Sequence, residues 1–183
     1  MTNLLAKTGN WKFIIPVLVA FIYCIYLFQV AEKQLNTLAG EAAPIIDMRK
    51  DYDVAEIKEF FTKIKAEGRE IHRHTTGVVD MIFPFAYGLL FIFLSAFFLK
   101  KITNPSSNWM YLSLVPVLLM IVDYMENFNT LEMLATFPDL TAEMVDNAAS
   151  ITGIKGILVD ISMGFTFLLG IIWLVKWGLN RNN

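Results

Sequence analysis

Four long apolar stretches constrain the fold of this chain more than any other feature of its sequence. They run from about Ile14 to Ala31, Val78 to Leu99, Met110 to Val122 with a polar continuation, and Ile151 to Val175. A helix needs about 20 predominantly apolar residues to cross the hydrocarbon core of a bilayer. Charged residues make up only 17% of the chain, against about 25% in an average soluble domain. The sequence therefore predicts an all-α fold, a four-helix transmembrane bundle with a small helical extracytoplasmic cap.

The predicted spans cover about residues 12–31, 78–99, 109–130 and 151–176, within a single membrane domain of residues 1–183. The first stretch is longer than the apolar region of a typical signal peptide, so we interpret it as a retained span. Its Cys24 is the only cysteine of the chain, which excludes an internal disulfide. We expect the lipid bilayer as a partner and, given a net charge of -2, no nucleic acid.

The distribution of charge predicts that both termini lie in the cytoplasm. Lys100 and Lys101 follow the second span, whereas residues 102–154 contain no lysine or arginine, and further basic residues flank the termini. Basic loops stay on the cytoplasmic side of a membrane. The first loop, about residues 32–77, points the other way, because it holds eight basic residues as well as nine acidic ones.

The first loop carries the signals of a folded helical cap. Asp53 and Glu56 have the spacing of a capping box, and apolar residues then recur at helical intervals up to Ile64. Gly68 either ends this helix or only loosens it, and a second helix after it is expected to run directly into the second span. This cap is either a helix that lies on the bundle or a lid over a site between the spans, and the sequence does not separate the two.

Ionisable residues inside or beside the apolar stretches are the candidate functional residues. Asp123, Glu126 and Asn127 are spaced to share one helical face. Lys155 is the nearest predicted cation for the two acids, while Arg69 or Arg73 is a candidate partner for Asp80. Pro84 follows Asp80 by four residues and removes the helical donor to its carbonyl. Because a charge in a membrane span costs about 2.5–3.5 kcal/mol, such groups normally face the interior of a bundle.

Two interpretations of these residues stay open. In the first they line an outward-facing polar site that binds a small polar ligand or lipid headgroup, or transfers protons. In the second they form an internal ion network that only fixes helix register in a structural or complex subunit. A channel is disfavoured, because four helices leave little room for a pore. We expect no cofactor and no metal: His72 and His74 lie two residues apart and cannot share an ion on one helix.

The chain resembles a group of uncharacterised prokaryotic four-span membrane proteins that share an order of short motifs. The most specific is Asp-Tyr-x-Glu-Asn in the third span, and the matching residues here are Asp47, Arg49, Tyr52, Glu67, Gly68, Arg69, Asp80, Phe83, Pro84, Tyr87, Asp123, Tyr124, Glu126, Asn127, Phe137, Pro138, Asp139 and Lys155. The resemblance covers most of the chain from about residue 45 and implies no activity.

The predicted ligand-binding set combines the motif residues with the intramembrane charges. It consists of Asp80, Tyr87, Asp123, Glu126, Asn127 and Lys155, with Arg49 and Arg69 holding the loop over them. The two acids are expected to accept hydrogen bonds or carry protons, and Lys155 to be their counter-charge or an anion contact. The sequence leaves open whether the protein is an enzyme and whether it forms a homo-oligomer.

Overall fold

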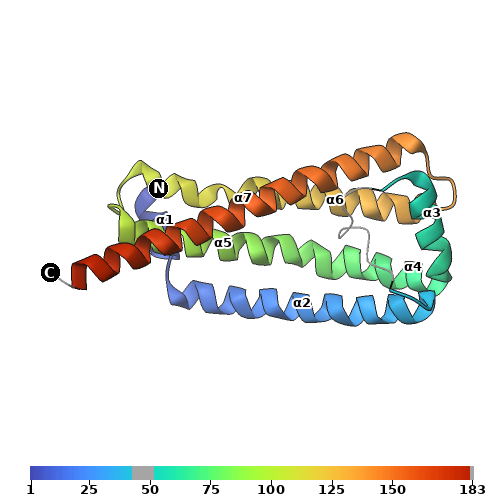
Figure 1. Ribbon diagram of the computed structural model, residues 1–183, viewed down its shortest axis with the longest axis horizontal. Coiled ribbons are helices and arrows are strands. Elements are labelled where there is room, and N and C mark those ends of the chain that lie inside the picture. The colour runs from blue at the N-terminus through green and yellow to red at the C-terminus, as the bar shows by residue number, and fades with distance from the viewer. Residues whose placement is uncertain (43–51, 182–183) are drawn as a thin grey trace. The chain divides into compact units, whose positions relative to one another are not determined.

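The computed structural model describes residues 1–42 and 52–181, and within these residues the chain is helical and contains no strand. Four long helical runs dominate it: α2 (Trp11–Ala39), the continuous run α4 (Lys65–His74), η2 (Thr75–Val79) and α5 (Asp80–Ile102), the run η3 (Asn108–Leu114) and α6 (Pro116–Thr136), and α7 (Ala142–Arg181) (Figure 1). Each run is long and apolar enough to cross a membrane. The predicted all-α fold with four spans is confirmed.

The chain divides into two compact units, and each of the long runs contributes to both. The terminal unit comprises Met1–Phe21, Phe85–Met120 and Ile157–Asn183, and the loop unit comprises Ile22–Pro84 and Ile121–Gly156. The terminal unit holds the short helix α1 (Thr2–Thr8), and the loop unit holds α3 (Val54–Lys63). All of the intramembrane acids and the lysine predicted for the site lie in the loop unit.

The terminal unit is built around small and apolar side chains. Its core contains Ala96, Leu99 and Met110, which are at most 3% exposed. Gly9 lies against the backbone of α5, where an added Cβ would come within 2.4 Å of the Phe97 nitrogen. The exposed indole rings of this unit, such as those of Trp11, Trp109 and Trp177, are typical of residues at the boundary between lipid and water. Outward-facing aliphatic side chains on α2 and α7 suit a lipid environment.

The loop unit carries the predicted cap. Asp53 begins α3 with a reciprocal capping box, in which the two backbone amides of Asp53 and Glu56 each bond the other's side chain. The buried face of α3 comprises Ile57, Phe60 and Phe61, and it packs with α6 and the start of α7 in one apolar core (Figure 1). This part of the sequence prediction is confirmed: periodic apolar residues bury one face of an amphipathic helix.

The helix break falls earlier than predicted. The chain turns at Lys65, which has a φ of 61°, and α4 begins there. Gly68 lies inside α4 and is buried against Ile64 and Leu35, where an added Cβ would be 2.6 Å from the Ile64 Cβ. The prediction of Gly68 as a helix end is therefore wrong. The glycine allows close packing between α4 and its neighbours, which sequence spacing does not distinguish from a terminating role.

Polar contacts fix the other ends of the loop-unit helices. Thr141 accepts a hydrogen bond from the Met144 amide at 3.2 Å and thereby caps the N-terminus of α7. The turn before it contains a cis peptide bond between Phe137 and Pro138. At the surface, Lys63 bonds Glu41 at 2.6 Å, and this hydrogen bond holds the pKa of the Glu41 carboxyl below its ordinary value.

Candidate functional site

Two acids of α6 and one lysine of α7 form a buried cluster in the loop unit. The Lys155 ammonium donates to Asp123 Oδ1 at 3.3 Å and also to Glu126 Oε2. We call these three residues the acid–lysine cluster. The one-face spacing of Asp123 and Glu126 and their pairing with Lys155 were both predicted from the sequence, and both are present.

A side-chain amide replaces the helical hydrogen bond that a proline removes. Pro84 lies four residues after Asp80 in α5 and has no backbone N–H to donate to the Asp80 carbonyl. The Asn127 side chain donates to that carbonyl instead, at 2.6 Å. The neighbouring carbonyl of Met81 accepts a 3.0 Å hydrogen bond from the Tyr124 hydroxyl. Two residues of the Asp-Tyr-x-Glu-Asn motif thus attach α6 to the first turn of α5.

The polar groups of this site are almost completely withdrawn from the surface. Asp80, Asp123, Glu126 and Asn127 are at most 4% exposed, whereas the Lys155 side chain is 16% exposed. Removing a charged group from water costs several kcal/mol even after the protein relaxes around it. Pairing and hydrogen bonding must offset that cost, so the geometry of the cluster is tightly constrained. The lysine is its most accessible member.

A small cavity extends the polar region from Asp80 toward the cap. Its volume of about 10 Å³ is about that needed for one water molecule. Asp80, Thr76 and His72 line one side of it, and apolar residues of α2 line the other. His72 is 2% exposed and its Nδ1 lies 3.1 Å from the Thr76 hydroxyl. From the sequence His72 was considered only as a metal ligand, although its spacing to Thr76 is about one helical turn.

The arginines predicted to pair with Asp80 contact other groups. Arg69 donates to the Phe61 carbonyl at 2.8 Å, and its guanidinium lies 4.7 Å from the centre of the Phe137 ring. Arg73 donates to the Leu134 carbonyl at 3.1 Å. Arg69 therefore attaches α4 to α3 and to the turn after α6, and Arg73 attaches α4 to α6. The prediction that one of them reaches Asp80 is corrected. Arg49 lies outside the described residues.

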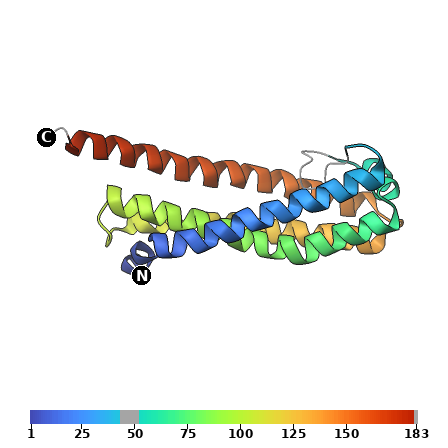
Figure 2. The same cartoon turned by 90° about the horizontal axis from the view of Figure 1, so that it is seen from below.

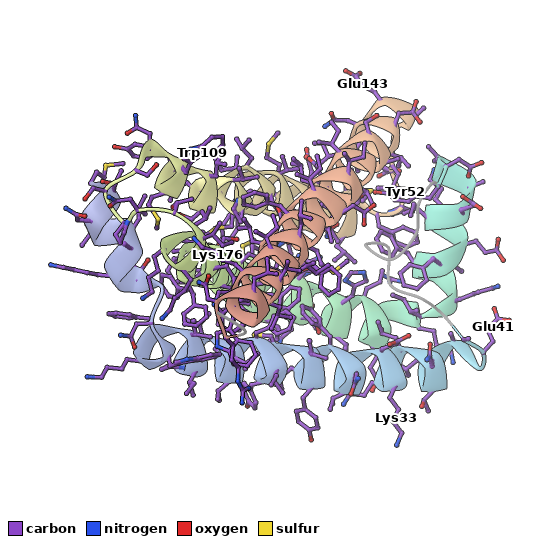
Figure 3. All side chains as sticks on the ribbon, turned by 60° about the vertical axis from the view of Figure 1, so that its left-hand side comes forward. Lys33, Glu41, Tyr52, Trp109, Glu143 and Lys176 are labelled. Atoms are coloured by element: carbon purple, nitrogen blue, oxygen red, sulfur yellow. The ribbon has the colours of Figure 1, made fainter. Side chains whose placement is uncertain are left out.

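The two predicted tyrosines have different surroundings. Tyr87 belongs to the terminal unit, where it is 6% exposed and its ring lies 6.2 Å from that of Phe91. Tyr52, which precedes α3, is buried in the loop unit, and its hydroxyl is 3.3 Å from the Thr152 hydroxyl of α7 (Figure 3). Thr152 lies three residues before Lys155, so Tyr52 attaches the start of the cap close to the acid–lysine cluster.

Comparisons with known proteins do not assign this chain to a family. No protein-family model, no curated protein and no solved structure matches the chain.

Proposed function

We propose that the acid–lysine cluster, with Asp80 and Asn127, forms a membrane-embedded site that binds a small polar ligand or a lipid headgroup. The observation that carries this proposal is that one ammonium bridges two carboxylates that are at most 3% exposed. Buried ion networks are a poor route to stability, because well-packed apolar residues of similar volume often stabilise a protein as much or more. Ionisable residues in membrane spans are accordingly associated with function by default.

The chemistry of the cluster indicates what such a ligand carries. The carboxylates of Asp123 and Glu126 accept hydrogen bonds, so they suit ammonium, guanidinium or hydroxyl groups. Lys155 is the most exposed member of the cluster, and its long side chain has the rotamer freedom to move away. We therefore propose that a ligand reaches the acids by displacing the lysine ammonium, which then contacts an anionic part of the same ligand.

The proposed orientation places the site in the outer half of the membrane. Basic residues beside the termini and after the second span support cytoplasmic termini under the positive-inside rule. The exposed tryptophans of the terminal unit support the same placement. The cap, which belongs to the loop unit, would then face the outer side.

Ligand retention through purification tests the proposal. The full chain is extracted in mild detergent, and small molecules and lipids released by organic solvent are quantified by mass spectrometry. We expect one species near stoichiometric amounts in the wild type and its loss from Asp123→Asn and Glu126→Gln. Glu132→Gln is the matched control, because Glu132 is an exposed acid of the same helix. Equal lipid and small-molecule content in all four proteins would contradict the proposal.

A structural role is the second candidate, and one observation favours it. Lys155 joins α7 to α6, while Asn127 and Tyr124 join α6 to α5, so the polar residues cross-link three helices of the loop unit. Under this alternative the protein is a non-catalytic subunit or scaffold. It predicts that neutral variants lose stability without losing any bound species, and that a stoichiometric protein partner co-purifies through the cap.

A further inference from the structure

An open groove runs between α2 and the α4–η2–α5 run, apart from the acid–lysine cluster. Its volume is about 720 Å³, within the range of sites that hold a small molecule. The ribbons of α2 and of the run that begins with α4 lie side by side here (Figures 1 and 2). Leu27, Val30, Ala31 and Gln34 of α2 form one wall of the groove, and residues from Glu67 to Val79 form the other. All of the residues that line the groove belong to the loop unit.

The groove changes from polar to apolar along both of its walls. On α2 the polar residue is Gln34, and Leu27 lies two turns earlier in the same helix. On the opposite wall the polar residues Glu67, Glu70 and His74 come first, and Val78 follows. With a rise of about 1.5 Å per residue, the two gradients span roughly 10 and 16 Å. A groove of this length with one polar and one apolar end matches the headgroup and the first methylenes of a lipid.

The charges at the polar end favour an amine. Glu67 and Glu70 supply carboxylates. Among the described residues, Arg73 forms a 3.7 Å ion pair with Glu70, and the Glu70 side chain is 77% exposed. Lys33, the nearest lysine along α2, points away from α4 (Figure 3). The Gln34 amide and the His74 ring have N–H groups that can donate hydrogen bonds to the oxygens of a phosphodiester. Two acids beside these donors complement a headgroup that joins an ammonium to a phosphate.

The backbone of the groove wall is also irregular. Thr75, Val78 and Val79 line the groove from η2, which is a π-helix. Such wide turns widen a helix locally and occur frequently at functional sites. From this geometry and the charge pattern, we propose that the groove binds one phospholipid with an amine-bearing, zwitterionic headgroup, with its ammonium at Glu67 and Glu70 and an acyl chain along Leu27, Val30 and Val78.

Native mass spectrometry of the full chain tests this assignment. Dioleoyl phosphatidylethanolamine or dioleoyl phosphatidylglycerol is added to the detergent-solubilised protein, and the apparent Kd of the first bound lipid is measured. We expect phosphatidylethanolamine to bind at least fivefold more tightly. The double variant Glu67→Gln/Glu70→Gln should weaken its binding by about tenfold, within the range expected for the loss of two solvent-accessible ion pairs. Both positions are exposed, so the variants are expected to fold, which circular dichroism checks.

Matched variants separate headgroup selection from filling of the groove by any lipid. Glu59→Gln/Glu143→Gln removes two exposed acids of the loop unit that do not line the groove and should keep the preference. Val78→Trp blocks the apolar end and should weaken binding of both lipids. Equal affinity for the two lipids, or a preference that survives Glu67→Gln/Glu70→Gln, would overturn the proposal. Competition by millimolar phosphoethanolamine, which has no acyl chain, would overturn the assignment to a lipid.

Discussion

Replacing Lys155 by methionine tests the energetic argument for the acid–lysine cluster most directly. Methionine retains an unbranched apolar side chain and removes the ammonium that Asp123 and Glu126 share. Breaking a buried ion pair from one side costs about 3–5 kcal/mol. Because the Lys155 side chain is 16% exposed, we expect about 3 kcal/mol. For a chain of this length that corresponds to a fall of about 6–12 °C in the unfolding midpoint.

The assay is thermal unfolding of the purified protein in one detergent, followed by circular dichroism. Lys176→Met is the matched control, since Lys176 is an exposed lysine of the same helix that donates only to the Ile102 carbonyl among the contacts described for it. The neutral triple variant Asp123→Asn/Glu126→Gln/Lys155→Met completes the set. It removes all three charges together but leaves two buried amides, so we expect it to lose less stability than Lys155→Met, which leaves two buried carboxylates without their ammonium.

The three results discriminate between the interpretations of the cluster. A midpoint for Lys155→Met within a degree of Lys176→Met would refute the reasoning, because the ammonium would then contribute nothing to the buried acids. A triple variant that is stable but retains no ligand would mean that the charges serve binding at a cost in stability. A triple variant as unstable as Lys155→Met would favour the structural interpretation instead.

Three further variants test local features of the fold by thermal unfolding. Asp53→Ala removes the capping box of α3 and should lower the free energy of unfolding by about 0.5–2 kcal/mol. An unchanged midpoint would mean that this capping box contributes no stability. Gly9→Ala places a Cβ against the α5 backbone and should cost about 1–3 kcal/mol. Gly164→Ala meets no atom within 4 Å, so it should be neutral or stabilise α7 by up to about 1 kcal/mol, and a large loss there would contradict the described packing.

The elements that could be predicted from sequence are those set by local chemistry. The spans follow from apolar length, the start of α3 from the Asp53 and Glu56 pair, and the shared face of Asp123 and Glu126 from helical spacing. The pairing with Lys155 could be predicted because few cations occur near the membrane spans. In each case the determining residues lie close in sequence, or the alternatives are few.

The features that escaped prediction depend on contacts between distant segments. Gly68 was a candidate helix end, yet it lies inside α4, buried against Ile64 and against Leu35 of α2. Arg69 or Arg73 was expected to pair with Asp80, but Arg69 contacts a carbonyl of α3 and the Phe137 ring, and Arg73 contacts a carbonyl of α6. The π-helix η2 also shifts the register between Arg69 and Asp80, so a face computed at 3.6 residues per turn no longer holds across it.

The Asp80 carbonyl links Pro84 to Asn127, because the proline leaves it without a helical donor and the asparagine donates to it. A double-mutant cycle tests this link between sequence and site. Asn127→Leu removes the donor to the Asp80 carbonyl and should cost about 1–3 kcal/mol. Pro84→Ala restores a backbone N–H that can donate to the same carbonyl. In that background we expect Asn127→Leu to cost about 1–2 kcal/mol less, the size typical of directly coupled residues.

Tyr124→Phe is the control for this cycle. The Tyr124 hydroxyl bonds the carbonyl of Met81, whose helical donor four residues later is Phe85, and Phe85 has an N–H whether or not Pro84 is present. Its cost should therefore be the same in both backgrounds. Equal coupling for Asn127 and Tyr124 would mean that Pro84→Ala acts by general straightening of α5. Coupling confined to Asn127 would mean that the proline creates the free carbonyl to which the motif asparagine binds.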